Sequence, residues 1–162
     1  MIVNSLQELY RFFQYPRPVI SVDYGSKKLG SAVSSPDYNL SLPLKLIVSD
    51  SDKDKVTQII NILKEIDPCA LVIGLPINMD GSLGPQTLSV KKFANKILGR
   101  INIPIYFQDE RLTSKAADNY LKNLGINRKN RNNIDDLTAA CMILETTLSS
   151  VKKMLEQKTR YS

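Results

Sequence analysis

Three short apolar runs near the start of the chain constrain its fold more than any other feature. They cover residues 18–25, 29–35 and 40–49, and the first is rich in Val and Ile, which favour β-strands. The connections between the runs are too short for a helix to cross over a sheet, so consecutive strands must run in opposite directions. The sequence therefore predicts an antiparallel meander of three strands.

Helices and strands alternate after the meander. Residues 52–66 carry apolar side chains at spacings of three and four behind a capping Ser51, which predicts a helix. This order predicts an α/β fold with a mixed five-stranded sheet, in which the meander is joined to parallel strands and helices cover both faces. Further strands are expected at 69–74 and 103–108, and further helices at 86–98, 113–124 and 134–158.

The length of the chain predicts one domain. A single hydrophobic core is usual for 162 residues, so we expect one domain over residues 1–162. Residues 1–17 precede the first predicted strand, and the capping pair Ser5 and Glu8 predicts a short helical extension there, at about 5–14. No leader peptide or membrane-spanning run is recognisable, which indicates a cytoplasmic protein without a membrane partner.

The cysteine and histidine content limits the chemistry of the chain. It has no histidine, and its two cysteines, Cys69 and Cys141, lie far apart among apolar residues. Because zinc prefers Cys and His ligands, a zinc site is not expected, and both cysteines are expected to be reduced and buried. Catalysis would have to use carboxylates, lysines or water activated by another metal.

Three acidic sites fall at the ends of predicted elements. Asp23 lies near the end of the first strand, Glu110 follows the fifth, and Asp135 and Asp136 open the last helix. Two of the three have an ordinary explanation, since Asp23 could form a turn and the helical pair could cap. If these ends converge, the side chains form a cluster of oxygen ligands that suits Mg²⁺ or Mn²⁺.

The positive charge is concentrated in the last third of the chain. Residues 1–110 hold 12 basic and 11 acidic side chains, whereas residues 111–162 hold 10 basic and 5 acidic ones. A local excess of this kind fits a polyanion-binding surface, and it fits a solvated basic face equally well. The richest part, residues 111–131, contains one acidic residue, Asp118, and six basic ones: Arg111, Lys115, Lys122, Arg128, Lys129 and Arg131.

Four motifs resemble those of the YqgF/RuvX family. They are VDYGSKKLGSAVS at 22–34, VIGLPINMDGSLGPQ at 72–86, QDERLTSKAA at 108–117 and IDDLTAACMIL at 134–144. Members of that family are described as Holliday-junction-resolvase-like enzymes and as nucleases in the 5′-end maturation of pre-16S ribosomal RNA. The resemblance implies an RNase H-like fold and metal-dependent cleavage of pre-16S rRNA, in ribosomal precursor particles, or of branched DNA.

The resemblance also implies roles for individual residues. Asp23, Glu110 and Asp136 correspond to the catalytic, metal-binding carboxylates of the family, with Mg²⁺ or Mn²⁺ as the expected cofactor. Asp135 is an additional acid, which either helps to bind metal or caps the helix. The residues expected to contact nucleic acid are Lys27, Asn78, Asp80, Gly81, Arg111, Lys115, Arg128, Lys129 and Arg131.

Two other functions fit part of the sequence. A non-catalytic nucleic-acid-binding module in transcription or ribosome assembly would keep the basic surface and use the carboxylates structurally. An ATP-binding protein of the actin and sugar-kinase class would explain the D-x-G motif at 23–25, but such proteins usually need two similar domains. The sequence does not decide between a monomer and a weak homodimer, although a resolvase of symmetric junctions would normally be dimeric.

Overall fold

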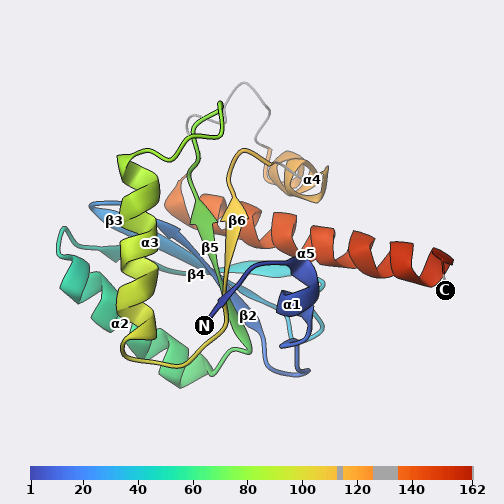
Figure 1. The fold of residues 1–162 in the computed structure, drawn as a ribbon, viewed down its shortest axis with the longest axis horizontal. Coiled ribbons are helices and arrows are strands. Elements are labelled where there is room, and N and C mark those ends of the chain that lie inside the picture. The colour runs from blue at the N-terminus through green and yellow to red at the C-terminus, as the bar shows by residue number, and fades with distance from the viewer. Residues whose placement is uncertain (113–114, 126–134, 162) are drawn as a thin grey trace.

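The computed structural model describes residues 1–112, 115–125 and 135–161. It contains a mixed sheet with helices on both faces (Figure 1). The strands are β1 (Ile2–Val3), β2 (Val19–Tyr24), β3 (Lys28–Ser34), β4 (Ser41–Val48), β5 (Ala70–Leu75) and β6 (Ile105–Asp109). The helices are α1 (Leu6–Tyr10), α2 (Asp52–Ile66), α3 (Pro85–Leu98), α4 (Lys115–Asn123) and α5 (Asp136–Tyr161).

The sheet has the order β1-β6-β5-β2-β3-β4. The predicted meander is confirmed, because β2 pairs with β3 and β3 with β4, both antiparallel. β5 runs parallel to β2, and β6 runs parallel to β5. The carboxyl ends of β2, β5 and β6 therefore meet at one edge of the sheet, which is where ligands usually bind in such folds.

The predicted count of five strands is wrong, because the N-terminal extension adds a sixth. Residues 2–3 pair in parallel with residues 105–106 of β6. The amino group of Met1 also donates a hydrogen bond of 2.9 Å to the carbonyl of Ile103. A strand of two residues is too short to show the alternation by which strands are recognised in a sequence.

The helix of the extension is shorter than the predicted range of about 5–14. It spans only Leu6–Tyr10, and its cap is the expected one: the Ser5 hydroxyl accepts the N–H of Glu8. The Glu8 carboxylate accepts the N–H of Asn4 at 2.7 Å, one residue earlier than in a standard capping box. The fully buried Leu9 then anchors this helix in the core beneath α5.

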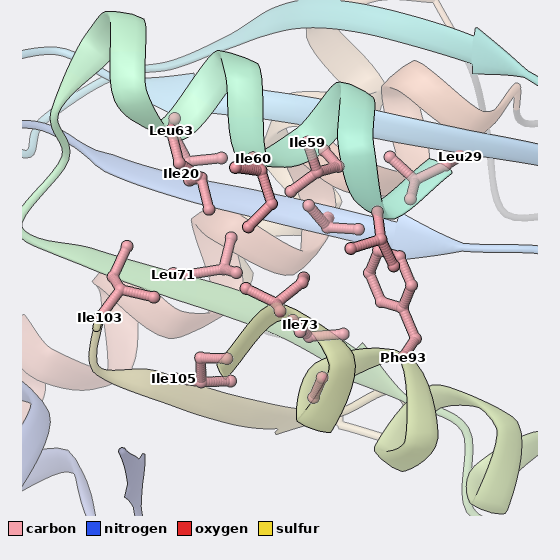
Figure 2. Packing of buried hydrophobic residues seen from close by; sticks show 14 of the residues in the cluster. Ile20, Leu29, Ile59, Ile60, Leu63, Leu71, Ile73, Phe93, Ile103 and Ile105 are labelled. Carbon is pink, nitrogen blue, oxygen red and sulfur yellow. The ribbon is translucent and has the colours of Figure 1, made fainter. Parts of the chain in front are cut away.

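Hydrophobic side chains form a core on each face of the sheet. α2 and α3 cover one face, where Phe93 and Ile59 pack on Ile20 and Ile73 (Figure 2). α5 covers the other face, together with α1 (Figure 1). Every residue of β5 is buried, as expected for a central strand that is covered on both sides.

Two polar contacts fix α5 against the sheet. The buried hydroxyl of Ser21 donates to the carbonyl of Ala140 at 2.7 Å, and the buried hydroxyl of Thr147 donates to the side-chain oxygen of Gln108 at 2.9 Å. Buried polar groups are costly when unpaired, so these bonds restrict how the helix can slide or rotate. They thereby set the position of Asp136, with which α5 begins.

Two expectations from composition can be compared with the structure. Cys69 and Cys141 are both free and buried, as predicted. None of the helices in the described ranges is long and apolar enough to cross a membrane.

Replacing Leu9 with Ala is expected to destabilise the protein by about 2–5 kcal/mol, because it leaves a cavity between α1 and α5. The free energy of unfolding in urea measures this. Gln7→Ala, an exposed change on the same helix, is the control and should stay within about 0.5 kcal/mol of the wild type. If both variants unfold like the wild type, the N-terminal extension does not contribute to the core.

Candidate active site

A cavity of about 280 Å³ opens at the edge of the sheet where the parallel strands end. Asp23, Glu110 and Asp136 all line it, although they come from β2, from the residue after β6 and from the start of α5. The structure thus brings together the three carboxylates that the sequence placed at separate element ends. Gln108, Asp109, Leu112, Met142 and Thr146 complete much of the lining.

Two glycines allow the carboxylates to approach the sheet. Gly30 pairs with Asp23 across β2 and β3, and a Cβ atom on Gly30 would lie 2.1 Å from the backbone oxygen of Asp136. A Cβ atom on Gly74 of β5 would lie 2.5 Å from Oε1 of Glu110. Although Glu110 is exposed as a whole, its carboxylate therefore rests directly on β5. Any side chain at either glycine would displace one of the acids.

The cluster changes the titration of its own members. The pKa of Asp23 rises from 3.8 to about 7, chiefly because burial disfavours the charged form and also because Glu110 and Asp136 carry negative charge nearby. A hydrogen bond between the side chains of Asp23 and Glu110 raises the pKa of Asp23 further. Burial raises the pKa of Glu110 as well, and the same hydrogen bond opposes that rise. Protonated Asp23 is thus the donor in this bond.

A cation could replace the proton that these carboxylates share. The described residues contain no group of three or more acidic or sulfur side chains already close enough to enclose one ion. The donor atoms are nevertheless all oxygens, which suits Mg²⁺ or Mn²⁺. Two of the acids share a hydrogen bond, and the charge of the third is felt at Asp23. Asp23, Glu110 and Asp136 are therefore the residues that could hold a divalent ion.

Asp135 caps α5 and does not line the cavity. Its Oδ1 accepts a hydrogen bond of 2.7 Å from the N–H of Thr138, and this bond holds the pKa of Asp135 below its usual value. Of the two roles that the sequence left open for Asp135, the structure favours capping. Asp136, the next residue, faces the cavity instead.

Arg111 is bound to a neighbouring acid beside the cavity. Its guanidinium group contacts both carboxylate oxygens of Asp109 at 2.8–3.2 Å and reaches the carbonyl of Asn78 at 3.5 Å. The pKa of Asp109 is lowered by this partner. Arg111 therefore ties the end of β6 to the loop at 76–84, and it has fewer free donors for a phosphate than the sequence suggested.

The predicted binding residues in the loop at 76–84 largely bond to one another. Oδ1 of Asp80 accepts the N–H and the hydroxyl of Ser82 at 2.9 and 2.6 Å, and the amide of Asn78 donates to the Ser82 hydroxyl at 2.9 Å. Gly81 has a φ angle of +88°, in the region that favours glycine. These residues therefore shape the loop first of all.

The remaining predicted nucleic-acid contacts divide into two groups. Lys27 is exposed in the turn between β2 and β3, and Lys115 is exposed at the start of α4. Arg128, Lys129 and Arg131 lie outside the described residues, so their role stays a prediction.

A buried lysine supports the turn that follows Asp23. The Nζ atom of Lys55, which is 1% exposed, donates to the carbonyls of Gly25 and Ser26 at 2.9 and 2.7 Å. It also lies 3.5 Å from a carboxylate oxygen of Asp52 and 4.7 Å from the centre of the Tyr24 ring. A buried charge requires such partners. Lys55 therefore fixes the turn that follows Asp23 and contains the exposed Lys27.

Sequence reasoning missed Lys55 and the two strand glycines, although signals for them exist. Lys55 stands four residues before Ile59 in α2, so it falls on the apolar face of that helix. Gly74 interrupts an otherwise apolar strand and Gly30 lies inside another strand, and a glycine within a strand indicates a close approach of other atoms.

A sequence profile of the RuvX family, described as "Holliday junction resolvase", matches residues 17–150. The chain belongs to the RuvX family. Relatives from Rickettsia bellii and Rickettsia felis, each named "Putative pre-16S rRNA nuclease", are 49% identical to it over 154 residues. These matches cover 95% of this RuvX chain and the full length of each relative.

Solved structures with similar folds include RuvC of Thermus thermophilus in complex with a Holliday junction substrate. It superposes with a TM-score of 0.58 at 13% identity, over 86% of this RuvX chain and 96% of the RuvC chain. A second Thermus thermophilus RuvC structure gives a TM-score of 0.54 at 11% identity. The likeness confirms the predicted α/β, RNase H-like fold class.

Asp23→Asn is expected to stabilise the metal-free RuvX protein above about pH 7. Asn cannot ionise, and its amide can still donate to Glu110. In the wild type the extra proton of Asp23 is held by the folded state between its unfolded pKa of 3.8 and its folded pKa of about 7, so stability falls as pH rises through this window. The Tm difference between variant and wild type should be small near pH 4 and largest above pH 7.

The control for this experiment is Asp37→Asn. The pKa of Asp37 is lowered by hydrogen bonds from Ser35 and Asn39, so its replacement should not raise Tm at high pH. An Asp23→Asn protein that melts below the wild type at about pH 8 would contradict the raised pKa of Asp23.

Gly30→Ala is expected to lower the free energy of unfolding by at least about 2 kcal/mol, because the new methyl group must displace the start of α5. Gly99→Ala is the control, since a Cβ atom there meets nothing closer than 3.6 Å. Urea denaturation of the two variants tests the difference. Equal stability of both would mean that α5 does not need its close contact with β3.

Proposed function

We propose that this RuvX protein is a nuclease that hydrolyses phosphodiester bonds of pre-16S rRNA during 5′-end maturation. The observation that carries the proposal is the convergence of Asp23, Glu110 and Asp136 in one cavity at the sheet edge. The names of the Rickettsia relatives support the choice of substrate. Such a protein would work in the cytoplasm, on ribosomal precursor particles, as a single domain and as a monomer or weak homodimer.

The same three carboxylates would hold Mg²⁺ or Mn²⁺. A divalent ion, when bound, supplies positive charge that stabilises the charge developing on a phosphate group and lowers the pKa of water. The protein contributes the orientation of the ligands. Ser21 and Thr147 fix α5 and hence Asp136, while Gly74 allows the Glu110 carboxylate to rest on β5.

Asp23 has the central place in the proposed site. It shares a hydrogen bond with Glu110 and is influenced by the charge of Asp136, so it interacts with both of the other acids. Lys27 lies in the turn directly after β2, the strand that carries Asp23. It is exposed, which suits a contact with the phosphate backbone of the substrate. Arg111 and Asp109 support the neighbouring loop.

Branched DNA is the second candidate substrate. The family description names Holliday junction resolvases, and one similar fold is that of a RuvC bound to a junction. A junction is two-fold symmetric, so this activity would require a dimer that presents two cavities to the substrate. Size measurements in solution, with and without junction DNA, distinguish this case from cleavage of a single RNA strand by a monomer.

Cleavage assays test the proposed function. End-labelled RNA from the pre-16S leader and a four-way DNA junction are each incubated with Mg²⁺, Mn²⁺ or EDTA. The wild type should cut in the presence of metal, and Asp23→Asn and Glu110→Gln should reduce the rate at least about 1,000-fold. Asp37→Asn, an exposed change on the far side of the meander, is the control and should cut normally.

The outcome also separates the alternatives. Preferential cutting of one substrate decides between RNA maturation and junction resolution. Wild-type cutting that persists in both carboxylate variants would show that the active site lies elsewhere. Binding of RNA without any cutting would favour the non-catalytic module.

A further inference from the structure

A second basic surface lies on the face of the sheet opposite α5. A groove of about 470 Å³ runs between α2 and α3 and is lined by Lys53, Val56, Thr57, Lys96 and Arg100. We call it the α2–α3 groove. Its three basic residues are all exposed. It is separate from the cavity that holds the carboxylates, since the two share no lining residue.

The charge on α3 and its flanking segments is one-sided. No acidic residue occurs between Asp80 and Asp109, a stretch that holds Lys91, Lys92, Lys96 and Arg100. Opposing charge comes from the first turn of α2, where Asp52 pairs with Lys96 at 3.1 Å and Asp54 lies nearby. The groove itself is lined by Lys53, Lys96 and Arg100 and by no described acid, so its lining is positively charged.

Existing contacts position the basic groups without burying them. Arg100 donates to the hydroxyl of Thr57 at 3.0 Å, and Asp52 holds Lys96, whose side chain remains 41% exposed. Lys96 and Arg100 therefore keep free hydrogen-bonding capacity while their positions are restricted. Restricted cations lose less entropy when they bind an anion than freely mobile ones do.

A chain of contacts connects the α2–α3 groove with the candidate active site. The turn after Asp23 is held by Lys55 through the carbonyls of Gly25 and Ser26. Lys55 contacts Asp52, and Asp52 contacts Lys96, which lines the groove. The exposed Lys27 stands in this same turn.

We propose that the α2–α3 groove binds the phosphate backbone of the nucleic-acid substrate outside the segment that is cut. The proposal rests on the proposed function, because it assumes that the substrate lies at the carboxylate cavity. The strand would leave that cavity past Lys27 and reach Lys53, Lys96 and Arg100. The α2–α3 groove would bind phosphate groups through their charge. It would therefore extend the contact between protein and nucleic acid without adding specificity for particular bases.

The lining of the groove favours nucleic acid over a protein partner. Val56 is its only aliphatic residue, and no aromatic residue lines it. The centres of protein interfaces are apolar and rich in aromatic side chains, whereas nucleic-acid interfaces are polar and positive. The α2–α3 groove matches the second kind in its charge, although most of its accessible lining is apolar, as expected where the methylene stems of long basic side chains form the walls.

Binding of short and long RNA tests the proposal. The probes are fluorescein-labelled RNAs of about 6 and about 30 nucleotides from the pre-16S leader, so that only the longer one can reach beyond one site. The triple variant Lys53→Gln, Lys96→Gln, Arg100→Gln is compared with Lys152→Gln, Lys153→Gln, Lys158→Gln, which removes equal charge from exposed positions of α5. All proteins also carry Asp23→Asn, so that cleavage does not disturb the measurement.

The groove variant should bind the long RNA at least about tenfold more weakly at low salt, and the slope of log Kd against log salt should fall by about 2 for three lost contacts with a single strand. Its affinity for the short RNA should not change. The α5 control should behave like its parent with both RNAs. Unchanged affinity and slope for the long RNA, or an equal loss in the α5 control, would overturn the proposal.

A charge-preserving variant separates charge from packing. The variant Lys53→Arg, Lys96→Arg, Arg100→Lys should retain the affinity for the long RNA and the salt slope. If its affinity falls as much as that of the Gln variant, the loss of positive charge does not explain the weaker binding, and the proposal fails. Cleavage of the short RNA by the groove variant with Asp23 intact tests the nuclease separately. A wild type that cuts nothing, with a groove variant that still loses affinity for the long RNA, would refute the nuclease and leave the groove standing.

Discussion

The contact between the first turn of α5 and Gly30 is the one on which the site depends most. The backbone of Asp136 comes so close to β3 that no side chain fits between them. Asp23 stands opposite Gly30 in the same strand pair, so this contact forces two carboxylates together. Burial and the negative charges of the other two acids then raise the pKa of Asp23, so a proton on Asp23, or a cation in its place, offsets the repulsion within the cluster.

Polar anchors along α5 maintain that contact against the repulsion of the acids. Ser21 lies two residues before Asp23 in β2 and holds the helix near its start, while Gln108 of β6 holds it further along. Both anchors share a face of the sheet with the carboxylates. The hydrophobic core beneath α5 contributes most of the burial, but hydrophobic attraction has no preferred direction. The hydrogen bonds add orientation, because each has a defined direction.

Features that depend on local sequence, such as turns and helix caps, were predicted correctly. The meander follows from its short turns, and α2 begins where Ser51 caps it. The sixth strand was missed because a strand of two residues shows no periodicity. The ion pair between Arg111 and Asp109 was missed because it depends on how the side chains are placed in the folded protein. The family resemblance named the three carboxylates, and the structure supplied the reason they meet. The basic side of α3 was hidden because charges were summed over residues 1–110, where acids elsewhere cancel it.

The position of Asp136 in the last helix has a consequence for synthesis of the protein. The chain leaves the ribosome from its N-terminus, so the sheet with Asp23 and Glu110 emerges before α5 does. Until that helix arrives, one face of the sheet lacks its cover, and Leu9 lacks the α5 side chains of its core cluster. A nascent chain that does not yet include α5 therefore holds only two of the three acids. The complete cluster can form only after α5 has been synthesised.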